Sequence, residues 1–220
     1  MSLMSKIVSF KNGQAIVSGV EMTPDALLML DNGIPVDIEL EILDGKKITP
    51  KQRRKVFALL NDIEMHTGTP REDMRSMFQD FLQYMNGYSE ISLSDCSRKI
   101  ASELIELIIM WVFQNDIPLN YKTSDLLKND RTFLYMCVIK RTCCICGKTG
   151  ADIAHRHAVG AGRNRNEIDH YGNQVLALCR SHHKQQHDIG IHSFNEMYHL
   201  DEWVDVNDTI NDMLKGVKHE

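Results

Sequence analysis

Two pairs of metal-binding residue types at the same spacing constrain this chain most. Cys143 and Cys146 form a Cys-x-x-Cys pair followed by Gly147, and Cys179 and His182 form a second pair after 32 intervening residues. A two-residue gap lets one tight turn present both side chains, and zinc favours thiolate and imidazole ligands. The pattern predicts one tetrahedral zinc site with four protein ligands. Such a site has no open position and is therefore structural.

Alternatives stay open for the cysteines. The chain has six of them and no apolar signal segment at its start, so a disulfide framework is not expected. Reduced core cysteines without a metal are a second interpretation. Cys144 has the wrong spacing to pair with Cys146, and we expect it to be a buried neighbour. A register shift from Cys143 to Cys144 would change one ligand.

The histidines outside this zinc site indicate chemistry. Residues 131–200 hold 8 of the 10 histidines and carry 9 Lys and Arg against 5 Asp and Glu, although the whole chain has a net charge of −5. This local positive charge suits a polyanion such as nucleic acid. His183 and His187 lie at positions i and i+4 of a helix expected to begin near Cys179, so they share one helix face. One helix can thus serve two metals.

The start of the chain predicts β-structure. Residues 6–20 alternate between apolar and polar side chains and are interrupted by Asn12-Gly13, which is typical of a β-hairpin. Residues 36–42 alternate strictly enough for a half-buried strand.

Helices are expected to follow these strands. Thr49-Pro50 provides a cap and a proline at the first helical position, and apolar residues then recur at helical spacing. The expected helices cover about residues 50–66, 70–82, 95–111 and 133–139. We place a boundary near residues 118–130, which gives two expected domains, 1–128 and 129–220.

Residues 141–187 combine into the pattern of a known family. The alternating residues 151–159 and 174–178 predict two strands that lead into the helix at Cys179, so zinc would pin the ends of a ββα unit. With its Cys-x-x-Cys pair, strand-borne histidine, middle asparagine and final Leu-Cys-x-x-His-His-x-x-x-His, the segment resembles HNH (His-Asn-His) nucleases. The residues that carry the resemblance are Cys143, Cys146, His155, Asn173, Leu178, Cys179, His182, His183 and His187. The expected fold class is α+β: an N-terminal β-hairpin and strand plus a helical domain, followed by a zinc-stabilised ββα-metal (HNH) module.

The resemblance implies hydrolysis of DNA phosphodiesters with a catalytic divalent metal (Mg, Mn, Ni or Zn) besides the structural Zn. His155 would be the general base, a role that a neutral imidazole titrating near pH 7 can fill. His183 and His187 would hold the catalytic metal on the scissile phosphate. Asn173 would brace the loop that presents the base, although it lies six residues before Cys179, where the family has about five.

Ala154 departs from the family pattern. Many members have His or Asp directly before the general base as a further metal ligand, and only His157 or Asp152 could compensate here. Without compensation the metal site would be weaker. Ala154 therefore keeps a second hypothesis open, a non-catalytic DNA-binding recombination mediator with a degenerate HNH module. A remoter third class is a zinc-ribbon module that binds proteins and has no affinity for DNA.

The basic loop of residues 160–166 contains Arg163 and Arg165, which are expected to contact DNA phosphates. A merely solvated loop is an equal alternative for either arginine. A second basic cluster, at the start of the expected helix near Pro50, would also suit DNA, but a solvated helix start is the commoner explanation. It consists of Lys46, Lys47, Lys51, Arg53, Arg54 and Lys55.

The whole layout is similar to HNH proteins of phages and prophages, whose N-terminal region is similar to the Orf recombination mediators of lambdoid phages. This resemblance implies binding of single-stranded or branched DNA, homodimers, and cooperation with a single-stranded-DNA-binding protein in recombination or replication. It also implies a cytoplasmic location in a bacterial host. No apolar stretch approaches the roughly 20 residues of a membrane span, so no membrane partner is expected.

Overall fold

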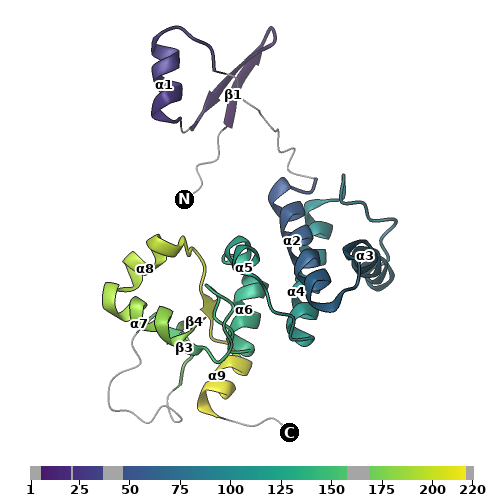
Figure 1. Cartoon of the computed structure of the whole chain (residues 1–220), viewed down its shortest axis with the longest axis vertical. Coiled ribbons are helices and arrows are strands. Elements are labelled where there is room, and N and C mark those ends of the chain that lie inside the picture. Colours follow the sequence, from purple (N-terminus) through teal and green to yellow (C-terminus); the bar gives the residue numbers. More distant parts are fainter. Residues whose placement is uncertain (1–5, 21, 37–46, 158–168, 217–220) are drawn as a thin grey trace. The chain divides into compact units, whose positions relative to one another are not determined.

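The computed structural model describes residues 6–20, 22–36, 47–157 and 169–216 (Figure 1). By its internal contacts the chain divides into two compact units, Met1–Ile42 and Leu43–Glu220. No helix within these described ranges has both the length and the apolar content needed to cross a membrane.

The first unit contains the predicted β-hairpin. β1 (Lys6–Lys11) and β2 (Gln14–Ser18) pair antiparallel, and Asn12 and Gly13 join them with φ angles of 53° and 78°. Both angles lie in the left-handed region that asparagine and glycine enter most readily, as a two-residue hairpin turn requires. The Asn-Gly signal is therefore confirmed.

The first unit also contains α1 (Pro24–Asp31), which the sequence pattern does not predict. The helix has the right start signals, since the Thr23 hydroxyl accepts a hydrogen bond from the backbone N–H of Ala26. Its interior is uniformly apolar, so it lacks the 3.6-residue periodicity that identifies a helix in sequence. The expected strand over residues 36–42 lies, from residue 37 onward, outside the described residues.

The second unit begins with helices and continues as a small sheet with three further helices around it (Figure 1). Thr49 caps the first of these helices, as the start signals predict; the structure adds a capping box with Gln52, and left-handed Gly68 closes the helix. β3, β4 and β5 pair antiparallel in that order. The elements are α2 (Pro50–Thr67), α3 (Arg71–Asn86), α4 (Arg98–Gln114), α5 (Tyr121–Leu127), α6 (Arg131–Ile139), β3 (Asp152–His155), β4 (Gln174–Leu178), α7 (Arg180–Ile189), α8 (Ile191–Tyr198), β5 (Val204–Asp205) and α9 (Asp208–Lys215).

Helix α6 connects the helical part of this unit to its sheet. It packs on α4 and on β4, and its buried side chains are part of a core that continues into both. Those side chains are Phe133, Leu134, Cys137 and Val138. The parts on either side of residues 128 and 129 thus share one core, and a functional division at that point stays a prediction.

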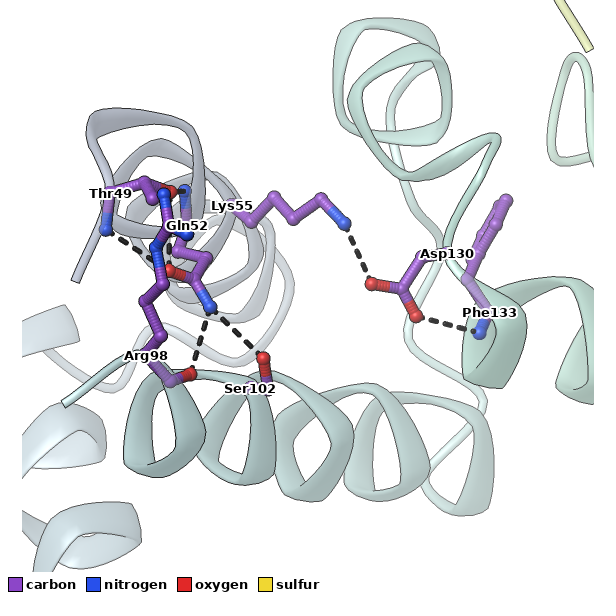
Figure 2. A network of polar contacts seen from close by, with 7 residues as sticks. All are labelled: Thr49, Gln52, Lys55, Arg98, Ser102, Asp130 and Phe133. Carbon is purple, nitrogen blue, oxygen red and sulfur yellow. Dashed lines mark hydrogen bonds and ion pairs between the residues drawn. The ribbon is translucent and has the colours of Figure 1, made fainter. Parts of the chain in front are cut away.

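A polar network fixes α2 to its neighbours (Figure 2). Lys55 Nζ lies 2.7 Å from Asp130 Oδ2, and their side chains are only 13% and 16% exposed. Gln52 Nε2 donates to the carbonyl oxygen of Arg98 (3.0 Å) and to Ser102 Oγ (2.9 Å). Because Asp130 also caps α6, these contacts hold α2 against α4 and against the start of α6.

This network also uses part of the basic cluster at the start of α2. Lys55 is paired with Asp130, and the Arg53 guanidinium donates to the carbonyl oxygens of Leu93 and Ser94. Lys51 and Arg54 remain exposed, while Lys46 lies outside the described residues. Two of the six cations, Arg53 and Lys55, therefore serve the fold.

Candidate metal centre and active site

The structure brings Cys143, Cys146, Cys179 and His182 together. Their ligand atoms all lie within 4.8 Å of one another, and no other such group of three or more occurs among the described residues. The Sγ atoms of Cys146 and Cys179 are 3.8 Å apart, and His182 Nδ1 lies 3.4 Å from Cys143 Sγ and 3.2 Å from Cys179 Sγ. Tetrahedral zinc, with bonds of about 2.3 Å to sulfur, separates neighbouring sulfurs by roughly 3.8 Å. The cluster can therefore bind a structural metal such as zinc.

A tight turn before β3 positions the first pair of these ligands. The backbone N–H of Gly147 donates to the carbonyl of Cys143 (2.8 Å), and that of Cys143 donates to the carbonyl of Lys148 (2.8 Å). Gly147 has a φ of 70°, in the left-handed region, and a Cβ built on it would lie 3.1 Å from the carbonyl oxygen of Leu119. Conformation and space together require glycine here.

Replacing Gly147 with alanine is expected to lower the free energy of unfolding by about 1–3 kcal/mol, because it adds a close contact to a strained φ. Gly150→Ala is the matched control, since Gly150 has a φ of 71° but no atom within 4 Å of the position that a Cβ would take. Thermal unfolding of both variants measures the difference. Equal losses of stability would show that the contact with Leu119 costs nothing.

The electrostatics of the cluster suit a bound cation. Burial raises the pKa of the Cys143 thiol to about 12, so a positive charge is needed to ionise it. Burial also opposes ionisation of Cys179, but the backbone N–H of His182 and the Cys146 and Cys143 thiols outweigh it and lower the Cys179 pKa. Burial and then the charge of Lys148 lower the pKa of His182, which favours the neutral imidazole that a metal requires.

Cys144 lies outside this group. Its side chain is fully buried, and its backbone N–H donates to the carbonyl of Ala177 in β4 (3.0 Å). The expected choice of Cys143 over Cys144 matches this arrangement.

Helix α7 begins at the cluster and carries two further histidines. His183 Nε2 and His187 Nε2 are 3.2 Å apart, close to the separation of two nitrogens on one metal ion with bonds of about 2.0–2.1 Å. Asp152 Oδ2 lies 3.5 Å from His183 Nδ1. Metal-binding histidines commonly turn their second nitrogen toward a carboxylate in this way, which leaves Nε2 for the metal.

His155, at the end of β3, faces a histidine that the sequence analysis did not single out. His155 Nε2 lies 3.2 Å from Nδ1 of His170, and the two rings stack with centroids 5.2 Å apart. His170 is 4% exposed, and its backbone N–H donates to Asn211 Oδ1 in α9 (3.1 Å). No sequence pattern reveals this role, because His170 belongs to no strand or helix and meets His155 only through the tertiary fold.

Asn173 clamps the chain just after β3. Its Nδ2 donates to the carbonyl of His157 (2.8 Å), and its Oδ1 accepts from the backbone N–H of the same residue (3.1 Å). This double hydrogen bond holds the end of the strand that carries His155. The bracing role expected of Asn173 stays a prediction, and these two hydrogen bonds are compatible with it.

Four histidines outside the Cys/His cluster border one cavity of about 630 Å³. His155, His170, His183 and His187 line it together with Asp152 and three cations. His157 is exposed and does not line it, and Ala154 is buried opposite Leu176 in the sheet. Of the two candidates to compensate for Ala154, only Asp152 thus reaches the cavity. The cations are Arg141, Arg180 and Lys184.

Arg163 and Arg165 lie outside the described residues. The other predicted site residues form two groups, four around the Cys/His cluster and the rest around the cavity or beside it. His182 and His183 are consecutive in α7, so the two groups meet on one helix.

Comparison with known proteins gives one match. The family model described as "Putative HNHc nuclease" matches residues 18–217. No curated protein and no solved structure matches the chain. The family match covers well over half of the sequence and includes both groups of site residues, and so the chain belongs to the Putative HNHc nuclease family.

Proposed function

We propose that this protein is a metal-dependent endonuclease that hydrolyses DNA phosphodiesters in the cavity lined by His155, His183 and His187. The observation that carries the proposal is that a histidine able to act as a base and a pair of histidines able to bind a metal open on the same cavity. The family match supports nuclease chemistry. A cavity edged with arginine and lysine suits a polyanionic strand.

The residues that would hold the catalytic metal are His183 and His187. Their Nε2 atoms are 3.2 Å apart, a separation that suits one metal ion. Asp152 Oδ2 is buried and makes no hydrogen bond. It lies within ion-pair distance of His183 (3.5 Å) and of Arg180 (3.2 Å). A divalent ion here would neutralise charge on the scissile phosphate and stabilise the leaving oxygen. Asp152 would keep the His183 ring turned so that Nε2 faces the cavity.

His155 would act as the general base. A neutral imidazole takes a proton from the water that attacks phosphorus, and the contact of His155 Nε2 with His170 Nδ1 (3.2 Å) would fix the ring and leave His155 Nδ1 to take that proton. Asn173 would keep His155 in place through its double hydrogen bond to the His157 backbone. Each of these side chains therefore has a separate task.

We also propose that residues 1–128 bind single-stranded or branched DNA during recombination or replication, and that Arg163 and Arg165 contact its phosphates. The support for this wider role is the sequence resemblance, with exposed Lys51 and Arg54 as the available cations at the start of α2.

The test is cleavage of supercoiled plasmid and branched oligonucleotides with Mg²⁺, Mn²⁺ or Ni²⁺, and without added metal. The parent protein is expected to cut only with metal. His187→Ala is expected to lower the rate at least about tenfold and to raise the metal concentration needed, because one ligand is lost. His192→Ala, which removes an exposed histidine of α8 outside the cavity, should cut like the parent. DNA binding without cleavage under every condition would contradict the proposal and favour a mediator.

A further inference from the structure

Arg141 has an unusual backbone conformation beside the cavity. It follows α6 with a φ of 52°, in the left-handed region. The other non-glycine residues with positive φ in the described ranges are Asn12, Asp116 and His199, which belong to the types that enter this region most often. Arginine gains no comparable local hydrogen bond there, so the conformation carries a cost.

The fold holds this backbone in place from both sides. The N–H of Arg141 donates to the carbonyl of Val138 in α6 (3.3 Å), and its carbonyl accepts from the N–H of Ala151 just before β3 (2.7 Å). The strained residue is thus anchored between the helix and the strand that carries His155. Glycine would satisfy the same backbone with less strain, so the arginine side chain needs a separate explanation.

Arg141 is half-buried and is one of the residues that line the cavity. Within the described part of the chain, its guanidinium makes no hydrogen bond and no ion pair, whereas Arg180 on the same cavity is paired with Asp152. None of its nitrogens is among the fully buried polar atoms, so the guanidinium reaches the solvent of the cavity and its donors are free for an anion. Its planar set of donors matches a phosphate group, which it can bind through two parallel hydrogen bonds.

We infer that Arg141 binds a phosphodiester group of the nucleic-acid strand that enters the cavity. The inference rests on the proposed nuclease function and adds a phosphate-binding residue outside the histidine set. One phosphate contact by a cation contributes about one unit to the dependence of log Kd on log salt concentration, and it does so without regard to base sequence.

The test measures binding of a fluorescent single-stranded oligonucleotide at several salt concentrations. The full-length chain carries His155→Ala throughout, so that the strand is not cut. Adding Arg141→Gly is expected to raise Kd about tenfold and to lower the salt slope by about 0.7–1, while the melting temperature stays equal or rises. Adding Arg141→Lys should restore the slope but only part of the affinity, because lysine keeps the charge and loses the planar donor set.

His199→Gly is the matched control. His199 has a φ of 50°, is exposed and does not line the cavity, so its replacement also places glycine on a left-handed backbone and should leave Kd and the salt slope unchanged. An Arg141→Gly protein with the parent's Kd and slope would overturn the inference, as would a lysine variant whose slope stays at the glycine value. The parent protein, with His155 and Arg141 intact, is assayed for DNA cleavage in parallel. If it cuts DNA, either of these results refutes the role of Arg141 and leaves the proposed function intact. If it does not cut DNA, the proposed function itself is refuted.

Discussion

Replacing His155 with alanine is expected to slow DNA cleavage by about 10²–10⁴-fold, the usual contribution of a positioned general base. The side chain is half-buried at the end of β3, and its loss leaves the strand pairing of His155 with Val175 unchanged. Binding of DNA and of metal should therefore stay close to the parent's values. Single-turnover cleavage at saturating protein and metal measures the chemical step directly.

Chemical rescue sharpens this prediction. Imidazole added to His155→Gly is expected to restore part of the rate, since it can enter the space left by the ring and accept the proton. It should not restore His183→Ala to the same extent, because that residue is assigned to the metal rather than to proton transfer. Cleavage by His155→Ala within about threefold of the parent, less than the smallest usual effect of a general base, would remove His155 from the mechanism.

Replacing Cys146 with serine is expected to remove the bound zinc and to lower the melting temperature by roughly 10 °C. Structural zinc contributes binding free energy directly to folding, and a ligand loss of about 3–5 kcal/mol corresponds to that shift in a protein of this length. Because α6 packs on both α4 and β4, the loss should spread into the helical part. Metal analysis of the purified protein and a thermal melt check both effects.

Cys144→Ala serves as the control for this variant. Cys144 is fully buried next to the cluster but is not one of its four members, so its truncation should cost only about 1–2 kcal/mol and leave one zinc per chain. Loss of zinc from Cys144→Ala, with zinc retained in Cys143→Ala, would show that the ligand register is shifted by one residue.

The sequence was most informative where local signals agree with the fold. The Asn12-Gly13 turn and the Thr49-Pro50 helix start depend on residues next to one another, and both appear in the structure where they were expected. The pairs Cys143/Cys146 and Cys179/His182 are likewise local signals, because a two-residue gap lets one turn present both side chains. Two such pairs of zinc-ligand residue types also predict that their four side chains meet at one site, because tetrahedral zinc takes four ligands.

The remainder depends on contacts that no local pattern contains. α1 lacks periodicity, and His170, whose backbone N–H donates to Asn211 in α9, meets His155 through contacts between distant parts of the chain. Arg141 carries no sequence signal at all, since its position at the cavity follows from a left-handed backbone between a helix and a strand. Residue types and spacings thus predicted the four members of the Cys/His cluster, whereas the side chains around the cavity required the tertiary structure.

Helix α7 carries residues of both proposed metal sites, so the geometry of both depends on the phase of one helix. Successive residues of a helix point about 100° apart, and here His182 faces the Cys/His cluster while His183 and His187 face the cavity. A one-residue insertion between His182 and His183 would turn the second pair away from Asp152 without altering the chemistry of any side chain. We therefore expect residues 179–187 to tolerate substitution at exposed positions such as Ser181 more readily than an insertion or deletion. Differences in length between related chains are expected to lie outside this segment.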